Sequence, residues 1–150
     1  MYDRDVAGTV VNVKGLVFYN TVTKKQEMDH AYKNGRPCLI IYSDDEYEYF
    51  LTMTSRSNVE KYDSHITVLD SDYLCKYLYP ACYKGINREE LKKEYVCLQH
   101  VYKMKIWGHG QGDIGKLKFY AYKNIIEKLK AYHRVDDIKE FLENESVLKR

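Results

Sequence analysis

The sequence lacks the features that mark several common classes of protein. No segment approaches the ~20 consecutive apolar residues of a membrane-spanning helix. Residues 1–5 are mostly charged and no apolar signal region follows them, so we expect no secretory signal and a cytoplasmic location. The net charge is only +2, which excludes a histone-like polycation.

Cysteine spacings typical of metal sites are missing, and so are other patterns of metal ligands. The four cysteines, Cys38, Cys75, Cys82 and Cys97, have no CxxC spacing and lie mostly inside apolar runs. Without a secretory signal, such residues are more often reduced core side chains than disulfides or zinc ligands. No cluster of Asp, Glu and His has metal-ligand spacing, which argues against a two-metal nuclease. We expect no metal and no cofactor.

The composition is that of a globular protein with an excess of tyrosine. A chain of 150 residues suits one domain over residues 1–150, and 45% hydrophobic with 31% charged residues is ordinary. Sixteen residues are tyrosine. A tyrosine ring can stack on nucleic acid bases, but tyrosine also favours β-strands. The tyrosines therefore fit either an RNA-binding surface or an ordinary sheet.

The stretch 35–57 predicts a β-hairpin around which the other segments are arranged. Residues 38–42 form a continuous apolar run, as in a strand buried on both faces. Residues 43–46 are turn formers. Residues 47–54 then alternate in polarity, which predicts a second strand with odd-numbered side chains on one face and even-numbered ones on the other.

The register of this hairpin predicts a phosphate site at its open end. If Ser43 pairs with Tyr47, then Arg36 lies opposite Thr54, about 5 Å away at Cα. The open end then gathers two guanidinium groups and two hydroxyl groups: Arg36, Thr54, Ser55 and Arg56. Such groups bind the oxygen atoms of phosphates.

The segments before the hairpin predict one strand pair and a loop. Residues 8–14 resemble a strand, and residues 16–19 would return along it as a hairpin. Residues 20–34 are polar without a clear period, which predicts a long loop or a short helix. This segment either is merely solvated or contacts a nucleic acid backbone through its basic and aromatic side chains: Lys24, Lys25, His30, Tyr32 and Lys33.

After the hairpin, the pattern predicts a charged connection, a strand and two short helices. Residues 65–69 have the composition of a strand. Ser71 and Asp72 would cap a helix over residues 73–79, which ends before Pro80. Residues 87–93 predict a further short helix.

Residues 96–107 alternate as one long strand, with His100 on its apolar face as a hydrogen-bonded core histidine. The glycine-rich segment 108–112 follows and predicts a flexible turn. His109 in this turn is either an ordinary loop residue or a substrate contact.

A long helix is predicted over residues 115–133, and a shorter one begins after Asp137, with Glu140 completing its cap. Five apolar residues form the core side of the long helix: Leu117, Ala121, Ile125, Leu129 and Tyr132. Segment 116–134 has a net charge of +5, and four of its cations would form a basic ridge: Lys116, Lys123, Lys130 and Arg134. The ridge is either a solvated face or a docking surface for phosphates. Strands first, with helices between and after them, predict an α+β domain with a mostly antiparallel sheet or small barrel.

The order of these motifs resembles the MazF/PemK-like endoribonuclease toxins. Residues 8–11 (GTVV) open a first strand, residues 35–41 (GRPCLII) lead into a buried strand, and Thr54-Ser55 close the next strand, as in that family. The longer chain with two C-terminal helices is most similar to the ToxN/CptN branch, the toxins of type III systems. In that branch a lysine stands two places after the serine, whereas here Arg56 follows the serine directly.

The resemblance implies a small, strongly twisted antiparallel sheet or SH3-like barrel with peripheral helices and two C-terminal helices. It also implies metal-independent cleavage of single-stranded RNA that leaves a 2′,3′-cyclic phosphate. Inhibition by a repeated RNA antitoxin, in a toxin–RNA assembly, is the expected regulation. The alternatives are a PemK-like toxin bound by a small acidic protein antitoxin (type II) and a non-catalytic RNA-binding module. No membrane partner is expected.

The reaction needs a proton acceptor for the 2′-OH, a proton donor for the leaving oxygen, and cations for the developing charge. Arginine suits only the last role, because its pKa is above ~12. The predicted catalytic residues are Arg36, Thr54, Ser55, Arg56 and His30, and Lys14, His65, His109 or a backbone or substrate group are the other candidate bases. The predicted RNA contacts are Lys14, Lys24, Lys25, Lys33, Tyr32, Trp107, His109, Lys116, Lys123, Lys130 and Arg134.

Overall fold

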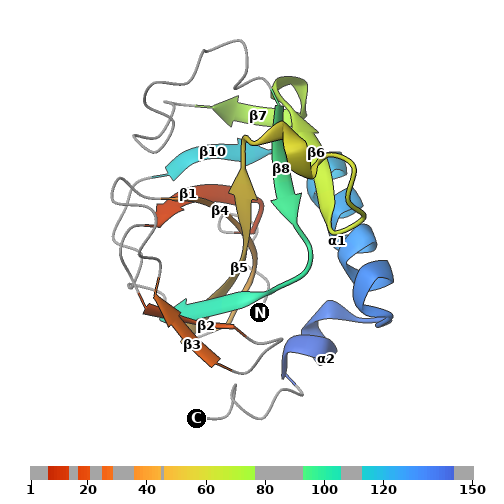
Figure 1. Ribbon diagram of the computed structural model, residues 1–150. Coiled ribbons are helices and arrows are strands. Elements are labelled where there is room, and N and C mark those ends of the chain that lie inside the picture. The colour runs from red at the N-terminus through yellow and green to blue at the C-terminus, as the bar shows by residue number, and fades with distance from the viewer. Residues whose placement is uncertain are drawn as a thin grey trace.

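Ten strands and two α-helices make up the part of the chain that the structure describes (Figure 1). This computed structural model describes residues 7–13, 17–20, 25–28, 36–44, 46–76, 93–105 and 113–143. The first five strands are β1 (Thr9–Val13), β2 (Val17–Asn20), β3 (Lys25–Met28), β4 (Arg36–Ser43) and β5 (Tyr47–Thr54). The next five are β6 (His65–Leu69), β7 (Tyr73–Lys76), β8 (Lys93–Cys97), β9 (Tyr102–Lys105) and β10 (Asp113–Leu117). The helices are α1 (Phe119–His133) and α2 (Ile138–Glu143), with 3₁₀ turns η1 (Ser57–Val59) and η2 (Asp70–Asp72).

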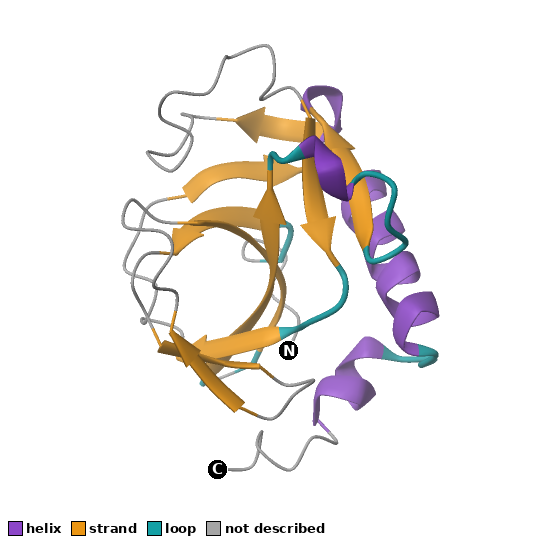
Figure 2. Ribbon diagram, viewed as in Figure 1, coloured by secondary structure: helices purple, strands orange, loops and turns teal. Residues whose placement is uncertain are grey.

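The strands form a curled antiparallel sheet in the order β3-β2-β9-β5-β4-β1-β10-β7. β5 also pairs with β8, and β8 pairs with β6, so these two strands branch from the end of β5. Figure 2 shows the sheet curving as a half-barrel, with α1 on its outer side and α2 beside it. The protein is therefore a mixed α+β fold with an antiparallel half-barrel and two helices, as predicted at that level.

The sheet buries apolar side chains on both faces. On the face covered by the helices, Leu39 and Leu51 belong to one cluster with Ile125 of α1. The opposite face holds a smaller cluster: Val11, Cys38, Ile40, Phe50 and Tyr102. In β5, the odd-numbered side chains lie in the first cluster and Phe50 lies in the second. This arrangement confirms the predicted alternation of residues 47–54 and the burial of residues 38–42 on both faces.

The register of the β4–β5 hairpin is the predicted one at its open end and differs by one residue near the turn. Cys38 pairs with Thr52, as expected. Ser43 pairs with Glu48, so the predicted pairing of Ser43 with Tyr47 is wrong. The cause is a bulge in the second half of β4, which places two residues of that strand opposite one of β5.

Asp44 closes the predicted turn between the two strands. Its Oδ1 accepts hydrogen bonds from the backbone amides of Glu46 (2.8 Å) and Tyr47 (2.6 Å). Its Oδ2 accepts a hydrogen bond from the hydroxyl of Tyr49 (3.1 Å). A short acidic side chain that satisfies backbone amides in this way favours a turn over continued strand.

Pairing of the N-terminal strands differs from the prediction. β1 pairs with β4 and β10, whereas β2 pairs with β3 and β9, so the described strands β1 and β2 do not form the predicted hairpin with each other. Residues 25–28, predicted within a loop or short helix, form strand β3. The curl of the sheet separates β1 from β2 by three other strands, and β3 is the local partner that β2 gains instead.

The predicted helix over residues 73–79 is wrong in its first half, because residues 73–76 form strand β7. Asp72 does not cap a helix there; its Oδ2 accepts a hydrogen bond from the amide of Leu69 (2.9 Å) in the η2 turn. Tyr73 is buried and Leu74 is 66% exposed, the alternation of a strand. Residues 77–79, the predicted helix 87–93 apart from Lys93, and the turn 108–112 lie outside the described residues.

The predicted long strand over residues 96–107 is two strands, β8 and β9, which pair with opposite ends of β5. Leu98 and Val101 in the connection are both buried in the helix-facing cluster, so the alternation is interrupted there. His133 of α1 holds this connection, with its Nε2 2.7 Å from the carbonyl oxygen of Leu98. His100 is therefore partly buried in a connection and not on a strand face, and its buried Nδ1 has no hydrogen-bond partner among the described residues.

The long helix begins at Phe119 and not at residue 115, because residues 113–117 form β10 between β1 and β7. The core stripe is confirmed for Ala121, Ile125 and Leu129, whereas Tyr132 is 39% exposed. Leu117 is buried, but it belongs to β10. The shorter helix is confirmed with its predicted cap, since Oδ1 of Asp137 accepts a hydrogen bond from the amide of Glu140 (2.9 Å).

The described cysteines, Cys38, Cys75 and Cys97, carry free thiols, as predicted, and Cys82 lies outside the described residues. Cys38 is a core residue, whereas the other two are only partly buried. In the described part of the chain, neither helix is long and apolar enough to cross a membrane.

Candidate functional site

The open end of the β4–β5 hairpin brings the first predicted site residues to one end of the sheet (Figure 1). From the Cys38–Thr52 pair, two further residues along each strand lead to Arg36 and Thr54. The outer neighbours of these two residues differ: the backbone of Arg36 pairs with Val13 of β1, and that of Thr54 pairs with Tyr95 of β8. β4 thus begins, and β5 ends, where the branch β8–β6 leaves the half-barrel.

The residues after Thr54 leave the sheet in a fixed turn. The Oγ1 atom of Thr54 accepts a hydrogen bond from the backbone amide of Arg56 (3.2 Å). Thr54 and Ser55 are partly buried, whereas Arg56 is exposed and its backbone is extended (φ −73°, ψ 114°). The hydroxyl hydrogen of Thr54 remains a potential donor, and the Arg56 guanidinium faces solvent, so both groups suit an incoming phosphate.

Residues 55–64 cross over β8 from β5 to β6. β8 lies antiparallel to both strands, so β5 and β6 run parallel on either side of it. Tyr95 of β8 is buried beneath this crossing segment, and its hydroxyl donates a hydrogen bond to Oε2 of Glu60 (3.3 Å). Backbone bonds of the 3₁₀ type stiffen the segment, including Glu60 N to Ser57 O (3.0 Å) and Tyr62 N to Val59 O (3.0 Å).

The register across β8 places His65 on the same sheet face as Thr54. Thr54 is paired with Tyr95, and His65 with Cys97, two residues further along β8. Alternate residues of a strand share a face, so all four side chains lie opposite the face that α1 covers. Two strand spacings separate β5 from β6, roughly 10 Å, and His65 is displaced from the level of Thr54 by two residues, roughly 7 Å, along β8. This shared face could not be read from the sequence, because it depends on the pairing of β8 with both strands.

His65 is in the chemical state that a general base requires. Its Nδ1 lies 2.9 Å from Oγ of Ser64, which fixes the ring orientation. Burial lowers the pKa of His65 below its ordinary value of about 6.5. The imidazole is therefore neutral near pH 7 and can accept a proton.

Three of the lysines predicted to contact RNA, Lys25, Lys123 and Lys130, lie away from this end of the hairpin. Lys25 is exposed on β3, at the far edge of the sheet. Lys123 is exposed on α1, and Lys130 forms a 3.0 Å ion pair with Glu127. Because α1 covers the opposite face of the sheet from Thr54, these helix lysines do not extend the site around Thr54.

The predicted four-membered basic ridge on the long helix is wrong. Lys116 belongs to β10, where it pairs with Thr9 and Cys75 and lies on the face opposite α1. Arg134 is the C-cap of α1 in the left-handed conformation (φ 57°). Only Lys123 and Lys130 remain of the ridge inside the helix itself. Seven predicted site residues lie outside the described residues: Lys14, Lys24, His30, Tyr32, Lys33, Trp107 and His109.

The arrangement suits the binding of an anionic group more than the binding of a metal. In the described ranges, no group of three or more His, Cys, Asp or Glu side chains could hold a metal ion. The hydroxyl of Thr54 and the neutral imidazole of His65 lie on one sheet face, and the exposed guanidinium of Arg56 follows at the end of β5. Comparison of the chain with models of known protein families gives no match, and comparison with curated proteins gives none.

Proposed function

We propose that the chain is an endoribonuclease toxin with a MazF/PemK-like fold, most similar to the ToxN/CptN branch that a repeated RNA inhibits. Its reaction is the metal-independent cleavage of single-stranded RNA by the 2′-OH, which leaves a 2′,3′-cyclic phosphate. The observation that carries the proposal is the open end of the β4–β5 hairpin. There Arg36 begins one strand, Thr54 ends the other, and Ser55 and Arg56 follow it directly.

The roles follow from the chemistry of each side chain. The guanidinium groups of Arg36 and Arg56 stabilise the negative charge of the phosphorane, because they stay protonated at every relevant pH. The hydroxyls of Thr54 and Ser55 donate hydrogen bonds to the non-bridging oxygens. Among the candidate bases, His65 lies on the face of Thr54 and is neutral near pH 7, so we assign it the proton of the 2′-OH.

The architecture supports the same proposal at a coarser level. A curled antiparallel half-barrel with two C-terminal helices is the kind of fold that the resemblance implies. Arg36 and Pro37 begin β4, and the residues that follow them, 38–42, are buried, which supports the proposal because the resemblance implies such a strand after these residues.

Expression in bacteria tests the proposal. Wild-type protein is expected to arrest growth, whereas the variants Thr54→Ala and Arg36→Ala are expected to permit it. Lys139→Ala, an exposed residue of α2, is the matched control and should arrest growth as the wild type does. Equal toxicity of wild type, Thr54→Ala and Arg36→Ala, or toxicity of none of the proteins, would contradict the proposal.

Material that co-purifies with the expressed protein distinguishes the two kinds of antitoxin. A bound, short, repeated RNA supports the type III assignment, and a small acidic protein supports the type II alternative. A chain that binds RNA with strong salt dependence but yields no cleavage products would be a non-catalytic RNA-binding module.

A further inference from the structure

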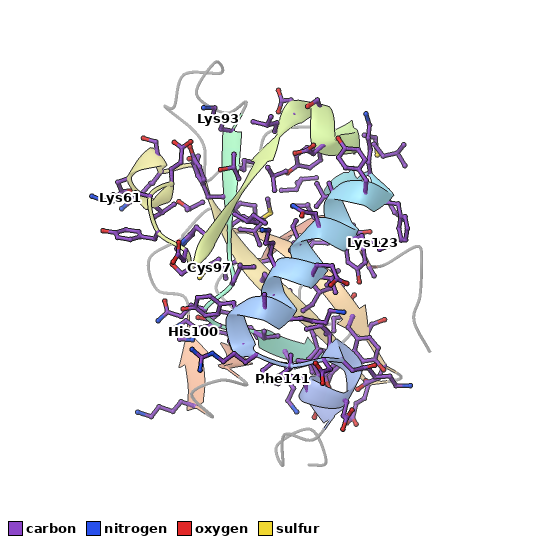
Figure 3. All side chains as sticks on the ribbon, turned by 90° about the vertical axis from the view of Figure 1, so that its right-hand side faces the viewer. Lys61, Lys93, Cys97, His100, Lys123 and Phe141 are labelled. Carbon is purple, nitrogen blue, oxygen red and sulfur yellow. The ribbon has the colours of Figure 1, made fainter. Side chains whose placement is uncertain are left out.

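An exposed aromatic side chain and three cations lie on the surface that surrounds the end of β5. Tyr62, in the crossing segment 55–64, is 52% exposed. The Nζ atom of Lys61 lies 5.5 Å from the centroid of its ring. Lys93 is exposed and its side chain shares the face of Tyr95, and Arg56 is exposed in the crossing segment itself. Figure 3 shows Lys61 and Lys93 on the side of the molecule away from Lys123.

We propose that Tyr62 and Lys61 form a subsite for single-stranded RNA, in which a nucleobase flanking the cleaved phosphate stacks on the Tyr62 ring. This inference rests on the proposed function, since the cleaved phosphate is assigned to Thr54 and the arginines. An exposed aromatic ring beside cations is the general means by which proteins hold single strands without reading their sequence. The Lys61 ammonium can contact the phosphate of the stacked nucleotide.

The backbone around Tyr62 is held in place, which is required of a stacking platform. The amide of Tyr62 donates to the carbonyl of Val59 (3.0 Å), and the amide of His65 donates to the carbonyl of Tyr62 (3.1 Å). The Tyr95–Glu60 hydrogen bond attaches the same segment to β8, the strand that pairs with Thr54. These hydrogen bonds and the pairing of β8 with β5 therefore fix the position of Tyr62 relative to the end of β5.

The charged side chains of this surface include more cations than carboxylates. The crossing segment and the start of β8 contribute three cations: Arg56, Lys61 and Lys93. They also contribute the carboxylates of Glu60 and Asp63, of which the former accepts a hydrogen bond from Tyr95. Tyr62 adds an exposed aromatic ring to these charged side chains. The ring can stack on a nucleobase, which the charged groups cannot do.

The test measures binding of a fluorescent, single-stranded RNA pool of randomised sequence to the full chain by anisotropy. Tyr62→Ala is expected to weaken binding roughly tenfold, since base–aromatic stacking accounts for that much affinity, and Tyr62→Phe is expected to retain it. Phe119→Ala removes another exposed ring, 72% exposed at the start of α1, and should leave binding unchanged. Lys61→Ala should weaken binding and reduce its salt dependence, unlike the control Lys139→Ala.

The outcomes separate this inference from the proposed function. If wild type binds and cleaves RNA but Tyr62→Ala binds as tightly as wild type, the subsite is wrong and the proposed function stands. If Tyr62→Phe loses as much affinity as Tyr62→Ala, the ring does not act by stacking and the subsite is again wrong. If wild type neither binds nor cleaves RNA, the proposed function fails and the subsite fails with it.

Discussion

The hydroxyl of Tyr73 donates a 2.6 Å hydrogen bond to Oε1 of Glu94, and both side chains are buried. The bond links β7, at one edge of the half-barrel, to β8 in the branch that carries the candidate site. Burial, followed by the charge of the neighbouring Glu94, raises the pKa of Tyr73 well above its ordinary value. The phenol therefore stays protonated and remains a donor to the carboxylate.

Removal of this donor should destabilise the fold. Tyr73→Phe leaves the buried carboxylate without its short bond, so we expect the free energy of unfolding to fall by about 2 kcal/mol. Urea unfolding followed by circular dichroism measures this change. The matched control is Tyr120→Phe, because Tyr120 makes a 2.7 Å bond to Asp72 but is 58% exposed. An equal loss of stability in the control and in Tyr73→Phe would contradict the prediction that the buried hydrogen bond stabilises the fold more than the exposed one.

Gly115 is required because the ring of Tyr73 lies against it. A Cβ atom at residue 115 would lie 2.9 Å from Cε1 of Tyr73 and 3.1 Å from the carbonyl oxygen of Cys75. Gly115→Ala should therefore destabilise the protein by about 1–3 kcal/mol. In a Tyr73→Ala background the same substitution should cost less, and a double-mutant cycle of urea unfolding measures the difference. Equal costs in both backgrounds would show that the ring is not the obstacle.

Stability should decrease in mild acid through two histidines. Burial lowers the pKa of both His65 and His133 below the ordinary value of about 6.5. Between the lowered values and about 6.5 the unfolded chain binds more protons than the folded one, so stability rises with pH. Unfolding free energies should be constant above about pH 6.5 and fall as the pH drops from there. His133→Gln should make this decline shallower, and an unchanged pH profile in that variant would refute its contribution.

The central hairpin could be predicted because its signals are local. The apolar run of β4 and the acidic turn at Asp44 specify strand, turn and strand without help from distant residues. The register at the open end was also predictable, since the bulge that shifts it lies near the turn. Because the bulge lies on the turn side of the Cys38–Thr52 pair, it does not change the predicted register toward Arg36 and Thr54.

Elements that depend on distant partners could not be predicted. Ser71 and Asp72 have the sequence of a helix cap, but Tyr73 packs against Gly115, more than forty residues away, and residues 73–76 become a strand. The start of the long helix was misplaced for the same reason, because residues 113–117 pair with β1 and β7. The place of His65 on the sheet face of Thr54 depends on β8 in the same way.

Substitution of His65 tests its role as the proton acceptor. His65→Asn should lower the rate of RNA cleavage about 100-fold or more while leaving RNA affinity within a few fold, because the base acts in the transition state. His133 belongs to α1, on the other side of the sheet, so the variant His133→Gln should retain the wild-type rate. Single-turnover cleavage assays measure both. A wild-type rate for His65→Asn would place the base elsewhere, with His30 the first residue to test.

The pH dependence of cleavage follows from the same assignment. A base with a pKa lowered below about 6.5 is mostly deprotonated at neutral pH, so the single-turnover rate should approach a plateau there and fall in acid. His65→Asn should lose this acidic limb even where a residual rate persists. Retention of the same limb in the variant would contradict the role of His65.

Cleavage of single-stranded RNA by the purified protein in the presence of EDTA tests the central claim most directly. We predict that wild type cuts the RNA and leaves 2′,3′-cyclic phosphate and 5′-hydroxyl ends, identified by mass spectrometry. Thr54→Ala and Arg36→Ala, purified in the same way, should each be slower by about 100-fold, because each lacks a group that stabilises the phosphorane. No cleavage by wild type, different ends, or equal rates for all three proteins would contradict the account.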